Sequence, residues 1–269
     1  MSPTPLGPQI LRAPDWSDVP DLVHGCCGRQ GGCSRGVFAE LNVSFRVGDD
    51  DNAVRENWRR IATAAGAPLR FATMQQVHGV RVATLGPDAV DPGEADALVT
   101  REPGVALSVL TADCVPILLV APRWHVVAAA HAGWRGTIGG IVAHTVAAMA
   151  ERFGAEPGQI RAVLGPAIGG CCYQVDRAVV DQLEEHWGPM PEAIQRQTPL
   201  DTGSDKALLD LRRANACILT RVGIEAAAIV SIGPCTRCAS TEFFSYRRAS
   251  AATGRGITGR QLSFIGWQK

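Results

Sequence analysis

The chain has 269 residues, of which 46% are hydrophobic, so it can bury a full core as one large domain. Its 26 basic and 26 acidic residues cancel, which argues against a surface for nucleic acid or an anionic membrane. No apolar run reaches the roughly 18–20 residues that span a bilayer, and the N-terminus lacks the basic start and apolar stretch of a secretory signal. These limits favour a small-molecule substrate.

The nine cysteines predict reduced thiols rather than a disulfide framework. Their number is odd, two pairs are adjacent (Cys26-Cys27 and Cys171-Cys172), and the chain is far larger than the small domains that disulfides staple. We therefore expect a cytoplasmic protein.

The N-terminal part predicts little regular structure. Residues 1–20 hold several prolines and no clear period, so we expect an irregular segment ahead of a single catalytic domain at 21–269. A short strand at 21–24 leads into a glycine-dense loop that continues to Ser34. Such a loop either connects two elements or turns backbone amides and Arg29 toward an anion.

Residues 52–65 predict an amphipathic helix. Aspartates directly before it suit a helix N-terminus, and Gly66 ends the pattern. Three strand patterns follow, at 69–77, 94–100 and 105–110. The first ends directly before His78, and the glycine after that histidine indicates a turn. We therefore expect His78 at the end of a strand.

Two apolar runs, 115–121 and 126–130, predict a buried hairpin. Residues 122–124 separate the runs and predict a tight turn. Antiparallel pairing about that turn places Cys114 opposite His131, with the two Cβ atoms about 5 Å apart. A thiol and an imidazole would therefore meet at one end of the hairpin.

The rest of the chain mixes helices and strands. A helix is expected over 137–153, with Thr137 as its cap and Gly154 as its stop. The other predicted elements are helices at 176–187 and 206–222 and strands at 159–164, 226–232 and 261–267. Because helices and strands do not alternate strictly, the pattern favours an α+β fold, a single domain of mixed β-sheets flanked by helices.

His78, Cys114 and His131 share a feature that sets them apart: each is predicted at an apolar strand end, beside a glycine or an aspartate. Two imidazoles and one thiolate leave one position of a tetrahedral zinc ion open, as in catalytic zinc sites. Such an ion makes a bound water a nucleophile near neutral pH. Three alternatives stay open: Cys114 as a nucleophile with His131 as its base, a copper centre, and three unrelated residues.

A second, weaker metal signal is the pair Cys235 and Cys238, separated by two residues. Cysteines at this spacing are typical of structural zinc sites, which need two further ligands. The pair leaves a metal-storage or scaffold role as a hypothesis.

Several segments, in order along nearly the whole chain, carry a family resemblance. They are 41–43 with 48–50, 76–79, 94–97, 111–114, 131–136, 171–173, 209–211 and 243–248. With them the sequence resembles the multicopper polyphenol oxidoreductase (laccase-like) domain family of the purine nucleoside phosphorylase and adenosine deaminase type, which has relatives linked to peptidoglycan editing. Thr-Gly-Arg occurs twice, at 253–255 and 258–260, and either copy fits the family pattern.

The resemblance implies a fold shared with cysteine-hydrolase-like toxins and a zinc ion on His78, Cys114 and His131, with copper as the other metal to consider. It implies a zinc-dependent purine nucleoside phosphorylase that acts on adenosine, inosine and methylthioadenosine and also deaminates adenosine. A cysteine-nucleophile hydrolase of peptidoglycan precursors and a copper polyphenol oxidase remain alternatives.

For the phosphorylase we expect a monomer that binds a nucleoside and phosphate and neither nucleic acid nor membrane. Asp113, Cys114 and Arg135 are the predicted catalytic residues, with Asp113 as a proton acceptor. Arginine forks match phosphate oxygens, and an aromatic ring can stack on a purine. The predicted substrate-binding residues are Arg29, Asn42, Tyr173, Arg247 and Arg248.

Overall fold

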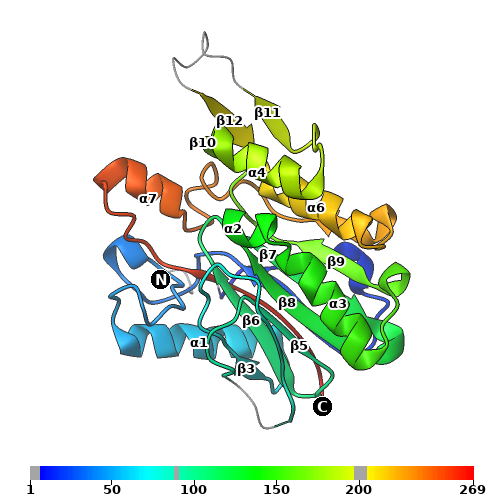
Figure 1. Cartoon of the computed structure of the whole chain (residues 1–269). Coiled ribbons are helices and arrows are strands. Elements are labelled where there is room, and N and C mark those ends of the chain that lie inside the picture. The colour runs from blue at the N-terminus through cyan, green and yellow to red at the C-terminus, as the bar shows by residue number, and fades with distance from the viewer. Residues whose placement is uncertain (1–6, 88–90, 197–204) are drawn as a thin grey trace.

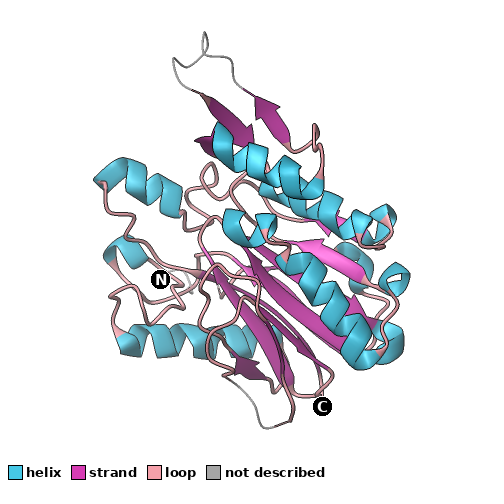
Figure 2. Cartoon of the chain, in the orientation of Figure 1, coloured by secondary structure: helices cyan, strands magenta, loops and turns pink. Residues whose placement is uncertain are grey.

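The computed structural model describes residues 7–87, 91–196 and 205–269 of the chain. Most of its strands gather at the centre and helices flank them, as Figure 1 and Figure 2 show. The strands belong to two large sheets and one small sheet within a single α+β domain. The expected fold class is therefore confirmed.

Two large sheets form the middle of the domain. The six-stranded sheet consists, in spatial order, of β13 (Ile229–Ser231), β9 (Arg161–Leu164), β7 (Val115–Ala121), β8 (Val126–Ala132), β5 (Ala97–Thr100) and β4 (Val82–Thr84). The five-stranded sheet consists of β1 (Ile10–Leu11), β2 (Leu22–Cys27), β14 (Gln261–Trp267), β6 (Val105–Thr111) and β3 (Arg70–Ala72).

The two large sheets pack face to face. Leu107 of β6 and Ile265 of β14 belong to the same buried cluster as Leu118 of β7 and Val127 of β8. Complete burial of such a side chain contributes roughly 1.5–3 kcal/mol. Because the cluster draws on both sheets, it holds one against the other.

Helices cover the outer faces of both sheets (Figure 1). On the six-stranded sheet lie α3 (Ile141–Phe153) and α6 (Leu211–Arg221), and on the five-stranded sheet lies α1 (Asp51–Ala65). The other helices are α2 (Trp134–Ile138), α4 (Arg177–Trp187) and α7 (Tyr246–Thr253). The layers therefore run helix, sheet, sheet, helix.

Strands β7 and β8 confirm the predicted buried hairpin. Residues 122–124 form a short 3-10 turn, which His125 closes with a φ of 53°. Ile117 and Leu119 of β7 face the helices, whereas Leu118 and Val120 face the other sheet. Burial of both faces explains why this run is apolar throughout.

Two further elements lie where the sequence predicts them. The Asp50 carboxylate caps α1 by accepting a hydrogen bond of 3.0 Å from the backbone N–H of Asn52, and Gly66 ends the helix with a φ of 76°. Strand β14 spans the predicted residues 261–267. Capping and period-two patterns are local signals, so the sequence carries them fully.

The predicted helix over 137–153 is broken in two. Helix α2 ends at Ile138, and α3 begins after Gly140, which has a φ of 79° that a right-handed helix cannot contain. Thr137 lies inside α2 and is not a cap. Its hydroxyl oxygen accepts a hydrogen bond of 2.9 Å from the Asn215 side chain. The predicted stop at Gly154 is confirmed.

The predicted helix over 206–222 is wrong in its first four residues. These form strand β12, which lies between two neighbours in a small antiparallel sheet. That sheet contains β10 (Gln174–Asp176), β12 (Lys206–Leu209) and β11 (Ile194–Arg196). Helix α6 begins only after Asp210, whose carboxylate accepts from the backbone N–H groups of Arg212 and Arg213. The capping aspartate marks the boundary that hydrophobic periodicity misses.

The expected irregular segment over 1–20 needs correction for residues 7–20, the part that the structure describes. Ile10–Leu11 forms β1 and pairs with Cys26 and Cys27 at the edge of the five-stranded sheet. Trp16 is buried and its ring lies 4.8 Å from that of His24. A segment without periodicity is therefore held by tertiary contacts.

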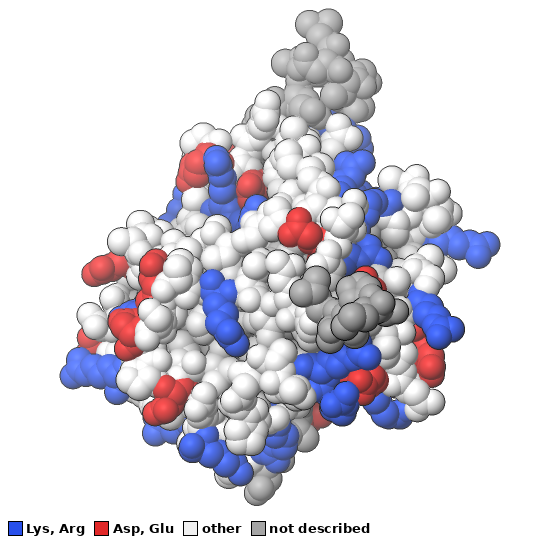
Figure 3. All heavy atoms as spheres, turned by 180° about the vertical axis from the view of Figure 1, so that it is seen from behind, with Lys and Arg blue, Asp and Glu red and all other residues white. Residues whose placement is uncertain are grey.

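The surface mixes charges of both signs. On the face that Figure 3 shows, Lys and Arg side chains are interspersed with Asp and Glu side chains. No helix among the described residues is long and apolar enough to cross a membrane.

Candidate metal centre

The structure brings His78, Cys114 and His131 together. One ligand atom from each lies within 4.8 Å of the others. Cys114 Sγ is 3.9 Å from His78 Nε2, and the two imidazole rings meet edge to face with their centroids 4.8 Å apart. Atoms this close can share one ion with bonds of about 2.0–2.3 Å.

Cys114 and His131 reach the site from neighbouring strands. His131 lies near the end of β8, and Cys114 directly precedes β7, which is antiparallel to it. The predicted register is wrong by two residues, because His131 is opposite Pro116. Cys114 lies beyond the paired part of β7, where Asp113 turns the chain with a φ of 99°.

His78 does not stand at a strand end as predicted. Strand β3 covers only residues 70–72 of the predicted 69–77, so His78 lies in the loop between β3 and β4. Its φ is 61°, a left-handed conformation that a histidine adopts rarely. Tertiary contacts must therefore hold this loop.

Asp96 is the residue that holds it. Its buried carboxylate accepts three backbone hydrogen bonds, from the N–H groups of Val77 at 3.2 Å, His78 at 3.0 Å and Gly79 at 2.6 Å. The same carboxylate lies 2.9 Å from Nδ1 of His131. One acidic side chain thus fixes the backbone of one histidine and the ring of the other, and it leaves His131 Nε2 to face the site.

Sequence reasoning assigned no role to Asp96, although it lies in the family segment 94–97. The signal was an acidic residue directly before the apolar strand β5, completely buried in the structure. A buried carboxylate needs partners, but the sequence does not show which ones.

The charges of these side chains favour a thiolate beside an imidazolium. Burial alone would raise the pKa of Cys114, but His131 and His78 lower it to about 6. Burial alone would lower the pKa of His131, but the Cys114 thiolate and the Asp96 carboxylate raise it to about 9. At neutral pH Cys114 is therefore an anion, which suits both a metal ligand and a nucleophile.

Gly133 leaves the space in which the three side chains meet. A Cβ atom at this position would lie 2.9 Å from His78 Cδ2 and 3.1 Å from Cys114 Sγ. Its φ of −78° is open to every residue type, so space rather than conformation requires glycine. The donors and the space between them fit a single zinc or copper ion.

Asp113 is held firmly beside the three residues. Its Oδ1 accepts a 2.6 Å hydrogen bond from the Thr236 hydroxyl, and its Oδ2 accepts a 2.7 Å bond from the backbone N–H of Arg247. Each oxygen keeps a further lone pair. The carboxylate is therefore oriented and still able to accept a proton.

A cavity of about 1090 Å³ opens over the site. His78, Cys114 and His131 line it, and so do four of the other residues singled out from the sequence: Asp113, Arg135, Tyr173 and Arg247. The Arg247 guanidinium lies over the Tyr173 ring at 4.9 Å. Burial raises the pKa of Tyr173 to about 12, so its hydroxyl stays protonated at neutral pH.

Several residues of the wall were not predicted. Arg46, Arg55, Arg260 and Phe45 all line the cavity. The second Thr-Gly-Arg copy thus supplies Arg260 to the wall, whereas the first begins at Thr253, the last residue of α7. No spacing rule links such residues, because they come from separate segments of the chain: Arg55 belongs to α1, and Phe45, Arg46 and Arg260 lie in loops.

The structure does not place Arg29, Asn42 or Arg248 on the cavity wall. The Arg29 guanidinium donates to the carbonyls of Ala39 and Ser240, and the Arg248 guanidinium donates to three backbone carbonyls. The buried Asn42 amide donates to the Ser44 carbonyl and to Asp49. In this structure the three polar groups bind loop residues, and their role in substrate binding stays a prediction.

Comparison with known proteins places this geometry in a family. A family model described as multi-copper polyphenol oxidoreductase laccase matches residues 23–268. The chain belongs to this laccase family. The resemblance inferred from short segments is therefore confirmed over nearly the whole chain.

Curated relatives of this laccase-family chain carry names from purine metabolism. It is 42% identical over 258 residues to "Purine nucleoside phosphorylase YlmD" of Geobacillus stearothermophilus, which covers 91% of this chain and 89% of the relative. It is 37% identical over 235 residues to "Adenosine deaminase RL5" of an unknown prokaryotic organism, which covers 84% of this chain and 88% of the relative. These names indicate an enzyme of purine metabolism.

Solved structures of laccase-family proteins share the fold. The crystal structure of YlmD from Geobacillus stearothermophilus has a TM-score of 0.86 at 38% identity and covers 98% of this chain and 97% of that one. The hypothetical protein YfiH of Bacillus licheniformis has a TM-score of 0.87 at 32% identity and covers 97% of both chains.

Proposed function

We propose that this protein is a zinc-dependent purine nucleoside phosphorylase that accepts adenosine, inosine and methylthioadenosine and also deaminates adenosine. The observation that carries the proposal is the group of His78, Cys114 and His131 on the wall of a cavity large enough for a nucleoside and phosphate. The names of the relatives support the same class of reaction.

The charge of the cavity suits an anionic co-substrate. Among the described residues that line it are five arginines, Arg46, Arg55, Arg135, Arg247 and Arg260, against the carboxylates of Asp91 and Asp113. Guanidinium groups bind phosphate oxygens in pairs. We assign phosphate binding to Arg135 and Arg247, because Arg135 follows Gly133 by two residues and the backbone N–H of Arg247 donates to Asp113, the neighbour of Cys114.

Phosphorolysis exchanges one bond at the ribose carbon C1′. A phosphate oxygen bonds to C1′ while the bond to purine N9 breaks, and the purine leaves with the electron pair and takes up a proton. The aromatic side chains of Tyr173 and Tyr246 on the wall provide flat surfaces for the base. Asp113, oriented by Thr236 and Arg247, is the carboxylate that can hold or pass the proton.

His78, Cys114 and His131 would hold the zinc ion. A zinc ion with one open position acts as a Lewis acid and lowers the pKa of a water molecule on it toward about 7, which is the chemistry that deamination of the base requires. Asp96 would keep both histidines in place.

The experiment is a nucleoside panel assayed with and without phosphate on protein of known metal content. We expect phosphate-dependent release of free base, and loss of both metal and activity in His78→Ala and Cys114→Ala. His144→Ala, a histidine of α3 outside the site, is the matched control and should keep both. Full activity in metal-free protein would overturn the zinc mechanism.

The same preparation tests the other chemistries. A covalent adduct on Cys114 after incubation with a thiol-reactive ester, together with full turnover in metal-free protein, would favour the nucleophile hypothesis. An intense thiolate-to-copper absorption with oxidase activity would favour the polyphenol oxidase. Either result without phosphorolysis would replace the proposal.

We further propose that the protein works as a cytoplasmic monomer. All nine cysteines are free thiols in the structure, which suits a reducing compartment. Size-exclusion chromatography with light scattering tests the oligomeric state, and cell fractionation tests the compartment.

A further inference from the structure

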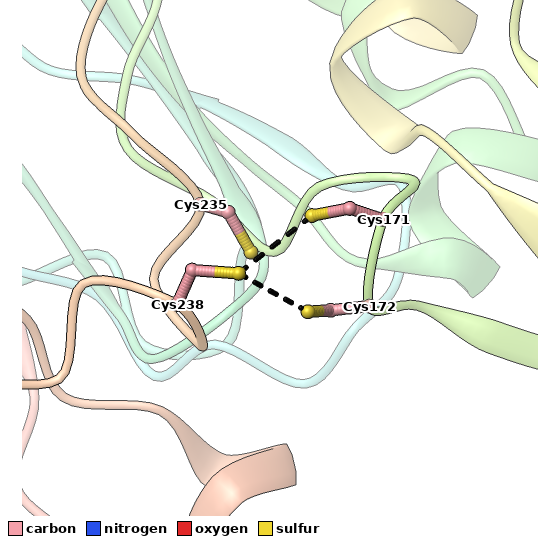
Figure 4. Close-up of side chains that lie close together, drawn as sticks. All are labelled: Cys171, Cys172, Cys235 and Cys238. Carbon is pink, nitrogen blue, oxygen red and sulfur yellow. Dashed lines mark hydrogen bonds between the residues drawn. The ribbon is translucent and has the colours of Figure 1, made fainter.

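A second group of metal-binding side chains lies outside the cavity. The thiols of Cys171, Cys172, Cys235 and Cys238 lie within 4.8 Å of one another. Figure 4 shows the four side chains gathered from two separate loops. The first two belong to the loop between β9 and β10, and the other two to the loop between β13 and α7. The fold therefore supplies the two further ligands that the sequence pair 235 and 238 lacked.

Two of the distances between the sulfur atoms lie close to those around a single tetrahedral ion, and the others are at most 4.8 Å. Four thiolates at the usual zinc–sulfur bond length of about 2.3 Å lie about 3.8 Å from one another, because the edge of a tetrahedron is about 1.63 times its radius. Cys238 Sγ is 3.8 Å from Cys171 Sγ and 3.4 Å from Cys172 Sγ. A disulfide bond would need about 2.05 Å between one chosen pair, whereas Cys238 approaches two partners alike.

The backbone around the four thiols is already ordered. The backbone N–H of Gly169 points to Cys235 Sγ at 3.2 Å, a contact that stabilises a thiolate ligand. The two loops are also joined by hydrogen bonds of 3.0 Å from Thr236 N–H to the Ala167 carbonyl and 3.3 Å from Arg237 Nη1 to the Cys172 carbonyl. The site thus needs little rearrangement to bind an ion.

We propose that Cys171, Cys172, Cys235 and Cys238 bind a second zinc ion, which is structural and ties the β9–β10 loop to the β13–α7 loop. Four thiolates complete a tetrahedral shell, so this ion has no open position for substrate. Soft thiolate ligands select zinc over the hard cations magnesium and calcium. This inference does not depend on the proposed reaction.

The second ion would also steady the wall of the cavity. Tyr173, which lines the cavity, directly follows Cys172. Thr236, which is fully buried between Cys235 and Cys238 in the chain, donates to Asp113. Both loops therefore contain residues that shape the first site, and removal of the ion should loosen them without removing a catalytic group.

Metal counting on the purified wild-type protein is the first test. We expect about two zinc ions per chain after zinc-replete expression. Cys114→Ser should retain about one, Cys238→Ser about one, and the double variant none. Cys217→Ser is the matched control, because its thiol contacts Glu192 outside both groups, and it should keep about two.

Cobalt substitution distinguishes the two sites by their ligands. A tetrathiolate cobalt centre absorbs more strongly in its thiolate charge-transfer bands than a centre with one thiolate, roughly in proportion to the number of sulfur ligands. We expect the strong bands to persist in Cys114→Ser and to disappear in Cys238→Ser.

Two results would overturn the proposal. One is a wild-type protein with a single zinc ion that Cys114→Ser removes, while all four thiols react freely with a thiol reagent. The other is a disulfide among the four cysteines, found by mass spectrometry of protein purified without reductant. Neither measurement uses Cys238→Ser, so both hold even if that variant fails to fold.

Discussion

The two cysteine-containing sites differ in ligand number and in surroundings. The first has three ligands from a loop and two strand ends, and it opens into a cavity lined by arginines. The second has four thiols from two surface loops, two of them exposed. Three ligands leave a position for chemistry, whereas four close the shell. We therefore expect that loss of a ligand lowers the activity at the first site and the folding stability at the second.

The largest expected effect is loss of catalysis in Cys114→Ser. The serine hydroxyl is a much weaker zinc ligand than a thiolate, so kcat/KM for phosphorolysis should fall by at least about 1000-fold, or about 4 kcal/mol. Steady-state assays with saturating phosphate measure it. A loss smaller than tenfold would mean that catalysis does not require Cys114 as a zinc ligand.

Asp96→Asn should have the next largest effect. An amide cannot accept from three N–H groups and His131 as the carboxylate does, so we expect zinc affinity at the first site to fall about 10–100-fold. Competition with a chromophoric chelator measures the affinity. Glu94→Gln, two residues away and exposed, is the control and should bind zinc like the wild type.

Gly133→Ala should weaken the first site about tenfold, because its methyl group would press on His78 and Cys114. The zinc content of the second site should not change. Gly86→Ala, where an added Cβ meets nothing within 4 Å, serves as the control. Equal zinc affinity in both variants would show that the space at Gly133 is not needed for metal binding.

Cys238→Ser should affect folding stability more than activity. Loss of the second ion should lower the melting temperature by at least about 5 °C, since metal binding that requires the folded loops adds to folding stability. Turnover should stay within about tenfold of the wild type, because no residue of the first site is removed. Thermal unfolding with Cys217→Ser in parallel measures the shift, and an unchanged melting temperature would contradict a structural role.

The smallest expected effect is a loss of folding stability at acid pH that comes from His24 rather than from the metal sites. Burial, with a smaller contribution from Arg12, lowers the pKa of His24 to about 4, and its neutral Nε2 accepts from the Ala13 N–H at 3.0 Å. The unfolded chain takes up the proton first, so stability is full above about pH 6.5 and falls as the pH approaches 4. We expect a loss of about 1 kcal/mol between pH 7 and pH 5.5.

His24→Gln, which cannot titrate in this range, should flatten that part of the pH profile. Chemical denaturation at several pH values measures the free energy of unfolding. If the free energy of unfolding depends on pH as steeply in His24→Gln as in the wild type, another group causes the effect. If this pH dependence disappears only in Cys114→Ser or Cys238→Ser, a metal site causes it.

The sequence by itself determined the elements whose signals are local. The apolar hairpin at 115–130, the helix over 52–65 with aspartates before it and the strand over 261–267 all follow from periodicity and helix-end signals within short windows. Residue type and position at apolar strands were also enough to single out His78, Cys114 and His131, which the structure brings together.

Only the tertiary structure decided the register and the partners. Cys114 lies two residues from the position that symmetric pairing about the turn predicts, and Asp96 finds its four partners across the β3–β4 loop and β8. The thiols of Cys171 and Cys172 meet that of Cys238, although 67 and 66 residues separate them from it in the sequence. Such contacts depend on how loops cross at the sheet ends, and no local pattern of residues encodes that crossing.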